Sequence, residues 1–171
     1  MSDKRYLALN VAGMATSDGA GVALTRMVGT QQLDMVDPFL MLDRMDNDDP
    51  DTYMAGFPNH PHQGFETVTV MLEGPMRHQD SVGNDGLLAP GDIQWMTAGR
   101  GIIHSEMPEM ISGKLKGFQL WVNLPAALKM IPPTYQDIPS AEVPIKDTGG
   151  ATVRVLAGTY DGATGPAKAQ T

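Results

Sequence analysis

Glycine and proline divide this chain into segments that are too short for long helices. Together they make up nearly a fifth of the 171 residues, against roughly 12% in average proteins. Glycine adopts the backbone angles that tight turns require, and proline can neither continue a helix nor donate a hydrogen bond inside a sheet. The pattern therefore favours many short strands joined by turns, which is an all-β fold.

Short apolar and β-branched runs between these turns predict the strands. Residues 116–124 (KGFQLWVNL) place apolar side chains at even positions on one face and Gln119 and Trp121 on the other, as in a half-buried strand. Residues 43–51 (DRMDNDDPD) are predicted to form an acidic, solvated loop. The other strands are expected at 6–11, 22–27, 39–42, 65–72, 76–82, 93–97 and 151–157.

The composition excludes several classes of protein and site. Without cysteine there can be no disulfide, thiolate metal site or cysteine nucleophile. We find no apolar run long enough to span a membrane and no signal peptide in the first ten residues. The net charge of −8, with no basic stripe, would repel phosphate backbones and anionic lipid. The sequence therefore predicts a cytoplasmic protein that binds neither nucleic acid nor membranes.

Two pairs of potential metal ligands repeat one spacing. His60 and His62 are two residues apart, so their side chains leave the same face of an extended strand. His104 and Glu106 repeat this spacing further along the chain. Two such strands facing each other would bring three imidazoles and one carboxylate to a single ion. A ligand set without thiolate suits one divalent transition metal, namely iron, manganese, nickel, copper or zinc, rather than calcium or magnesium.

Two further residues near these pairs leave alternatives open. His78 lies on a predicted strand of its own, and we expect it to be structural or to lie at the edge of a pocket. Glu66 shares the parity of His60 and His62. It is either a second carboxylate near the ion or a paired or solvated side chain.

Long segments of the chain resemble the pirin family. The most specific are residues 56–69 (GFPNHPHQGFETVT) and 90–106 (PGDIQWMTAGRGIIHSE). Shorter matching segments are 37–39 (DPF), 80–84 (DSVGN) and 119–125 (QLWVNLP). The resemblance runs from about residue 20 to 165 and implies an all-β cupin, or jelly-roll-like, barrel.

The resemblance also implies a ligand set and two kinds of activity. In pirins, the residues that match His60, His62, His104 and Glu106 hold iron. Some bacterial members are quercetin 2,3-dioxygenases, and animal members are redox-responsive partners of transcription factors. Iron is therefore the expected metal, with manganese, nickel, copper and zinc as alternatives.

The family pattern of two cupin domains predicts a division of this chain. We expect an N-terminal metal-binding barrel at 1–130 and a linker at 131–150. Residues 151–171 would be either a fragment of a second cupin domain or a C-terminal tail. On this interpretation the chain is a truncated form of a two-domain protein.

In the enzyme hypothesis, the metal activates a small aromatic substrate for reaction with dioxygen. A flavonol would bind the metal through its 3-hydroxyl oxygen, and dioxygen would react with the metal-activated substrate. Glu106 would be both a ligand and the general base that accepts the proton released when the flavonol binds. The expected apolar wall of the substrate pocket comprises Met71, Trp95, Met96, Ile103 and Met107.

Two other hypotheses fit the same residues. One is a non-catalytic, redox-sensing module, whose iron oxidation state alters a surface that a regulatory or metabolic protein recognises. The other is a structural metal in a small-molecule-binding barrel. Oxygen consumption with a flavonol separates the enzyme from both, whereas protein capture that depends on the iron oxidation state identifies the module.

Overall fold

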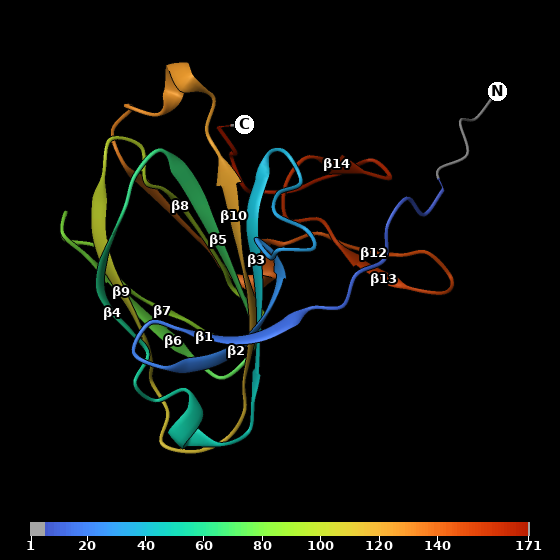
Figure 1. Cartoon of the computed structure of the whole chain (residues 1–171). Helices are drawn as coiled ribbons and strands as arrows, with labels where there is room; N and C mark the ends of the chain where they lie inside the picture. The colour runs from blue at the N-terminus through green and yellow to red at the C-terminus, as the bar shows by residue number, and fades with distance from the viewer. Residues whose placement is uncertain (1–5, 171) are drawn as a thin grey trace.

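Two antiparallel sheets face each other in the computed structural model, which describes residues 6–170 (Figure 1). The larger sheet has the order β1-β2-β3-β10-β5-β8-β11, and the smaller has the order β4-β9-β6-β7. The larger sheet comprises β1 (Met14–Asp18), β2 (Val22–Val28), β3 (Phe39–Asn47), β10 (Leu115–Asn123), β5 (Phe65–Glu73), β8 (Ile93–Thr97) and β11 (Thr134–Ile138). The smaller comprises β4 (Phe57–His62), β9 (Ile102–Pro108), β6 (Met76–Asp80) and β7 (Asp85–Leu88).

Two short hairpins and three 3-10 turns complete the described chain. The hairpins are β12 (Ile145–Asp147) with β13 (Thr152–Arg154) and β14 (Thr159–Tyr160) with β15 (Ala163–Thr164). The 3-10 turns are η1 (Pro50–Thr52), η2 (Ala126–Leu128) and η3 (Ser140–Glu142). Within residues 6–170, no helix has the length and apolar character needed to cross a membrane.

Apolar side chains from the two sheets meet in the space between them. One buried cluster draws on both sheets and comprises Val22, Met45, Tyr53, Met71, Met76, Leu88 and Leu115. A second comprises Met96, Ala98 and Ile102, with Tyr135 packed against them. Two sheets that enclose a common interior in this way confirm the all-β, jelly-roll-like barrel expected from the sequence.

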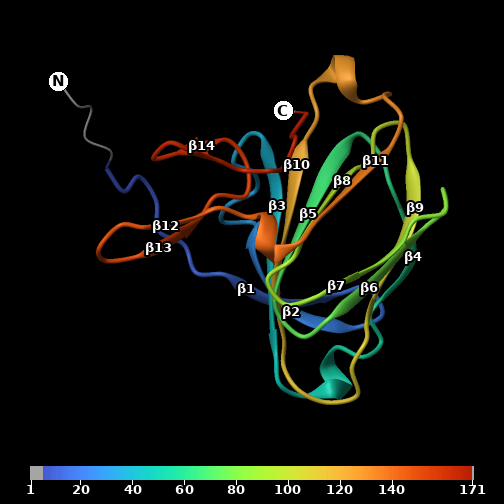
Figure 2. The ribbon, with the colours of Figure 1, turned by 180° about the vertical axis from the view of Figure 1, so that it is seen from behind.

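The opposite face of the larger sheet is also covered. Val68, Trp95 and Val122 pack there against Val143 and Leu156 of the C-terminal segment. Both ribbon views place this segment on the side of the larger sheet that faces away from the smaller one (Figures 1 and 2). Because β5 and β8 in this sheet are largely buried on both faces, their polar side chains must find partners within the protein.

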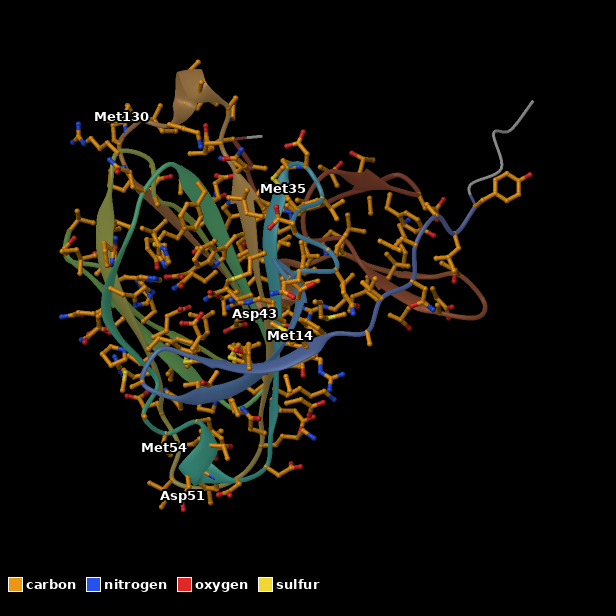
Figure 3. The ribbon with its side chains drawn as sticks, viewed as in Figure 1. Met14, Met35, Asp43, Asp51, Met54 and Met130 are labelled. Atoms are coloured by element: carbon orange, nitrogen blue, oxygen red, sulfur yellow. The ribbon has the colours of Figure 1, made fainter. Side chains whose placement is uncertain are left out.

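The predicted strand boundaries are corrected at two places near the N-terminus. Residues 6–11 form no strand, and the first strand is β1 instead. β3 continues through Asn47, so the first half of the predicted acidic loop is a strand. Asp43 lies inside the barrel, whereas Asp51 lies at its edge (Figure 3). Arg26 donates to both oxygens of Asp43 at 2.9 and 2.8 Å, which offsets the cost of burying this charge.

The predicted linker at 131–150 contains part of the larger sheet. β11 pairs with β8, and Ile138 and Val143 are buried. The flanking prolines concealed this strand from sequence analysis, but it lies at an edge of the sheet, where proline is tolerated. In the following segment, Val155 is buried, and the backbone N–H and C=O of Lys168 exchange hydrogen bonds with the side-chain amide of Gln136. That residues 151–171 begin a second domain stays a prediction.

A substitution at Gly99 tests how tightly the turn between β8 and β9 is packed. It has a φ of +52°, and an added Cβ would lie 2.2 Å from the carbonyl oxygen of Ile131. The Gly99→Ala variant should lose about 3 kcal/mol of unfolding free energy, from left-handed backbone strain plus overpacking. Gly83 has a φ of +100° with no atom within 4 Å of an added Cβ, so Gly83→Ala should lose only about 1–2 kcal/mol. Equal losses in urea unfolding would contradict the clash.

Candidate metal centre

The pairing of β4 with β9 brings three histidines together inside the barrel. These strands are antiparallel, with His60 directly opposite His104, and His62 points to the same side as His60. The ring centroids are 4.7 Å apart for His60 and His62, 4.5 Å for His60 and His104, and 4.8 Å for His62 and His104. Each ring offers one nitrogen, and these three atoms lie within 4.8 Å of one another.

The hydrogen bonds leave ring nitrogens free to face a common point. His104 is fully buried, and neither of its ring nitrogens has a hydrogen-bond partner among the described residues. Nδ1 of His60 lies 2.7 Å from the carbonyl oxygen of Pro58, to which it can only donate. That tautomer leaves a lone pair on Nε2 of His60, which lies 3.0 Å from Nε2 of His62.

The environment keeps the imidazoles of His62 and His104 uncharged. Burial, with contributions from His104 and His60, lowers the pKa of His62 to about 4. Burial, with contributions from His60 and His78, lowers the pKa of His104 to about 3. At neutral pH both rings therefore carry the lone pairs that a metal requires.

This arrangement fits a divalent transition metal. A buried polar atom without a partner is rare in proteins, and His104 has two such atoms in one ring. Two imidazoles on one ion at about 2.1 Å each place their nitrogens roughly 3–3.4 Å apart. The separation of 3.0 Å between His60 and His62 is of this size. The hydrogen bond from His60 to Pro58 is the kind of outer contact that orients a metal-binding imidazole.

Glu106 lies beside this cluster but does not belong to it. Its carboxylate oxygens accept hydrogen bonds from Nε2 of Gln119 at 3.0 and 2.8 Å and from Oγ1 of Thr69 at 3.1 Å. Nε1–H of Trp121 donates to Oε1 of Gln119 at 3.1 Å. An indole N–H can only donate, so it directs the amide NH₂ of Gln119 toward Glu106. The carboxylate is therefore held as an acceptor at the edge of the three-histidine cluster.

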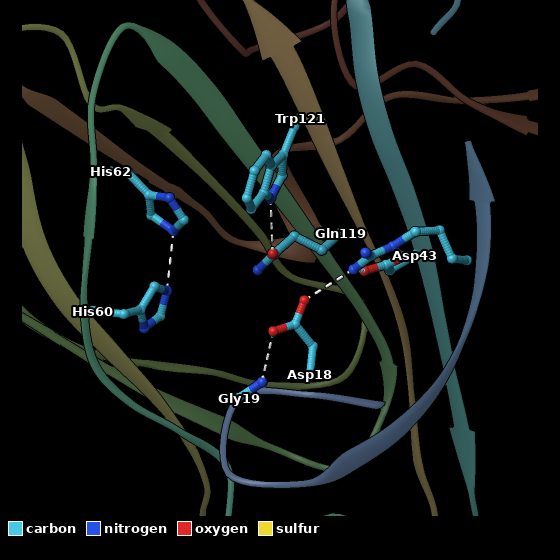
Figure 4. A network of polar contacts seen from close by, with 8 residues as sticks. Asp18, Gly19, Asp43, His60, His62, Gln119 and Trp121 are labelled. Atoms are coloured by element: carbon cyan, nitrogen blue, oxygen red, sulfur yellow. Dashed lines mark hydrogen bonds and ion pairs between the residues drawn. The ribbon is translucent and has the colours of Figure 1, made fainter. Parts of the chain in front are cut away.

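A cavity of about 490 Å³ opens onto His60 and His62. In Figure 4 His60 and His62 lie on one side and Asp43 on the other, with Trp121, Gln119 and Asp18 in the middle. The full lining comprises Asp18, Gly19, Ala20, Leu24, Met41, Asp43, Met45, Phe57, Pro58, Asn59, His60, Pro61, His62, Gln119 and Trp121. The size is within the usual range for small-molecule sites.

None of the five residues expected to form a substrate wall lines this cavity, and their contact with a substrate stays a prediction. Met71 and Met96 are buried in the two apolar clusters between the sheets. Trp95 faces the C-terminal segment on the outside of the larger sheet. Ile103 is half exposed, and Met107 alternates with the inward-facing Glu106. Trp95, Ile103 and Met107 adjoin inward-facing residues on their strands and therefore point to the opposite face, whereas Met71 and Met96 face the interior but pack within its apolar clusters.

His78 and Glu66 take different places in the structure. His78 is buried beside His104, with ring centroids 5.4 Å apart, and its Nδ1 lies 2.8 Å from the hydroxyl of Tyr135. Burial lowers the pKa of His78. Glu66 points away from the cavity, under the C-terminal segment, and accepts a hydrogen bond from Thr97 at 2.7 Å. The alternative that places Glu66 near an ion is wrong.

Sequence analysis missed the cavity-lining residues of the larger sheet. Gln119 and Trp121 share one face of β10, and Asp43 lies between Met41 and Met45 in the inward alternation of β3. For Asp43 a signal was present, because it alternates with Met41 and Met45, and a polar residue at a position that periodicity assigns to the interior indicates a site. We instead expected Gln119 and Trp121 on the polar face of a half-buried strand and Asp43 in a loop.

Comparison with known proteins identifies the family. Residues 21–122 match the family model of Pirin. The chain belongs to the pirin family. A pirin-like protein from Caulobacter vibrioides is 59% identical over 158 residues, which cover 91% of this chain and 57% of that protein. The chain spans about half the length of the curated relatives it matches.

Solved pirin-like structures share this fold. The crystal structure of quercetin 2,3-dioxygenase from Acinetobacter baumannii aligns with a TM-score of 0.80 at 36% identity, covering 92% of this chain and 58% of that one. The bacterial pirin YhhW from Escherichia coli, in complex with nickel(II), aligns with a TM-score of 0.60 at 26% identity, covering 73% of this chain and 53% of that one. These likenesses confirm the cupin-type barrel.

The ligand assignment in this pirin can be tested by metal content. We expect purified protein to carry close to one transition metal per chain, measured by inductively coupled plasma mass spectrometry. His62→Ala should lower that content sharply because it removes one of three converging nitrogens. His78→Ala, which alters a buried histidine outside the cluster, should retain the metal. Equal loss in both variants, or loss in neither, would contradict the assignment.

The low histidine pKa values predict how the metal-free protein responds to acid. Since His62 and His104 titrate near 4 and 3 in the folded state but near 6.5 when unfolded, the unfolded chain binds more protons between these values. The unfolding free energy should therefore fall as pH decreases from about 6.5 toward 4, by at most about 1.4 kcal/mol per pH unit for each histidine. Urea unfolding of chelator-treated protein measures this.

A matched variant separates this effect from the titration of other groups. His62→Gln removes one titrating ring, so its loss of stability between pH 6.5 and 5 should be smaller than that of the unaltered protein. The same slope in both proteins would show that His62 is not the group responsible.

Proposed function

We propose that this chain is the metal-binding half of an iron-dependent dioxygenase that acts on a flavonol-type substrate. One observation supports this most directly: a cavity large enough for an aromatic molecule opens onto the histidine cluster. The name and similarity of the Acinetobacter baumannii structure support the reaction class. Because the chain spans about half the length of its relatives, the proposed activity is that of a protein as long as they are, with this chain as its metal-binding half.

The proposed ligands are His60, His62, His104 and Glu106. The first three converge with lone pairs available, and Glu106 follows His104 on the same inward face of β9. A fourth ligand from Glu106 would exchange one of its hydrogen bonds from Gln119 for the metal. Iron is the proposed metal, and the nickel complex of YhhW shows that a related pirin accepts another member of the predicted series.

When bound, the metal would supply Lewis acidity that activates the hydroxyl oxygen of the substrate and the site at which dioxygen reacts. The protein's own contribution begins with the proton of that hydroxyl. Glu106 is the proposed base, because its carboxylate lies beside the cluster and accepts hydrogen bonds from Gln119 and Thr69. These donors hold the carboxylate in place while it receives the proton.

The cavity walls would orient the aromatic rings of the substrate. Trp121 stacks on Phe65 at an interplanar angle of 27°, so its indole presents a fixed plane beside His62. Phe57, Met41 and Met45 add apolar surface. A planar ligand held against these walls would present its metal-binding edge to the histidines and would exclude water from them.

The proposal is tested by oxygen consumption. Iron-loaded protein should consume dioxygen in the presence of quercetin and release carbon monoxide. Glu106→Gln keeps an oxygen atom at this position but removes the base, so it should retain much of the metal and lose about 10²- to 10⁴-fold in rate. An oxygen electrode and metal analysis on the same samples make the measurement, and His62→Ala is the control that should lose both metal and rate.

The longest available gene product should be assayed alongside this chain, because a missing part could leave the pocket open to water. No flavonol-dependent oxygen uptake in either form, with iron confirmed present, would contradict the enzyme proposal. That result would favour a redox-sensing interaction module, which capture of a protein partner that depends on iron oxidation state would then identify.

A further inference from the structure

The cavity has polar groups at two opposite places. On one side are His60 and His62, backed by the fully buried His104, whose ring nitrogens have no partner among the described residues. On the other side is the carboxylate of Asp43, and Arg26 joins it to the carboxylate of Asp18, which lies nearer the middle (Figure 4). We call the group formed by Asp18, Arg26 and Asp43 the acidic pole. The proposed metal chemistry uses the histidine side and leaves the acidic pole without a role.

The geometry of the acidic pole is fixed by three strands. Arg26 on β2 donates from Nε and Nη2 to the two oxygens of Asp43 on β3 at 2.9 and 2.8 Å. Nη2 of Arg26 also donates to Asp18 on β1 at 2.9 Å. The other oxygen of Asp18 accepts the backbone N–H of Gly19 at 2.8 Å. These contacts hold both carboxylates in place, and each oxygen keeps a lone pair because a carboxylate has about four acceptor sites.

The charges of the pole determine which ligand groups it favours. Asp43 raises the pKa of Arg26 by its hydrogen bond, with a smaller contribution from Asp18, so the guanidinium stays charged. Two carboxylates and one guanidinium leave one net negative charge on the cavity wall. This wall attracts hydrogen-bond donors and repels anionic groups. The side chain of Asp43 is only 6% exposed, against 51% for Asp18, so a hydrogen bond to Asp43 is better shielded from water.

The surface between the two sides is apolar and aromatic apart from Gln119, whose amide is bonded to Glu106 and Trp121. The indole of Trp121 is held flat against Phe65, and Leu24, Met41 and Phe57 line the rest of the passage. A ligand that spans the cavity therefore needs an apolar planar body with donor groups at the end farther from the histidines. Hydroxyl groups on an aromatic ring meet this requirement, because each is a neutral donor of hydrogen bonds.

We infer that the acidic pole recognises hydroxyl groups at the far end of an aromatic ligand. The cavity thus selects polyhydroxylated aromatic compounds over the same ring system without those hydroxyls. This inference rests on the proposed function for the orientation of the ligand, and it deepens that function by assigning specificity to Asp43 and Asp18. Sites built to hydrogen-bond a hydroxyl reject analogues that lack it, because polar groups are then left unpaired.

The test compares two flavonols that share the metal-binding edge. Quercetin carries hydroxyls on its other rings, whereas 3-hydroxyflavone has none there. Binding is measured under argon by quenching of tryptophan fluorescence, with metal content determined for every sample. The unaltered protein should bind quercetin at least tenfold more tightly. Asp43→Asn should reduce this preference to about twofold or less and leave the dissociation constant of 3-hydroxyflavone unchanged.

A remote ion pair provides the control. Asp85 accepts a hydrogen bond from Arg77 at 2.6 Å on the smaller sheet and lies outside this cavity, so Asp85→Asn should keep the full preference for quercetin. An equal loss of affinity for both flavonols in Asp43→Asn would assign the pole a purely structural role and overturn the inference. Equal affinities in the unaltered protein, or no binding of either compound, would overturn it as well.

The binding test is independent of the test of dioxygenase activity. Since binding is measured without oxygen, a preference for quercetin that depends on Asp43 supports the inference even if the oxygen-uptake assay fails. In that case the cavity is a binding site for polyhydroxylated aromatic compounds, and only the dioxygenase proposal is contradicted.

Discussion

The antiparallel register between β4 and β9 is the constraint on which the candidate metal centre depends. It sets His60 opposite His104, and the alternation of side chains then brings His62 to the same side. A slip of one residue would turn β4 over and move both of its histidines out of the barrel. The tight turn at Gly99, packed against the carbonyl of Ile131, joins β8 of the larger sheet to β9, and its carbonyl oxygen accepts the backbone N–H of Gly64, which lies between β4 and β5.

Burial of the larger sheet on both faces explains how polar groups can persist inside so small a barrel. The C-terminal segment covers one face with apolar contacts, and the smaller sheet covers the other. Polar side chains on the inner face then satisfy one another, as in the sequence of contacts from Trp121 through Gln119 to Glu106. On the smaller sheet, neither ring nitrogen of His104 has a partner among the described residues, and a buried, unpartnered imidazole beside two others is suited to bind a metal.

The cavity combines these features into one binding surface. Its histidine side belongs to the smaller sheet, whereas its acidic pole and aromatic wall belong to the larger one. The affinity of the cavity for a ligand held between them would therefore depend on the relative placement of the two sheets. Membership of the pirin family and likeness to a quercetin 2,3-dioxygenase structure are the reasons for proposing that this surface binds a flavonol.

The sequence by itself determined the all-β class, most of the strands and the candidate ligands. These are local properties: turns depend on glycine and proline, and two histidines separated by one residue share a face of any extended strand. Only the tertiary structure decided which face of β10 lines the cavity, that Asp43 is buried against Arg26, and that Met71, Trp95 and Met96 lie elsewhere. Periodicity divides a strand into two faces, but when both are covered it cannot say which one looks into the site. That choice depends on how the two sheets and the C-terminal segment pack, which no local pattern encodes.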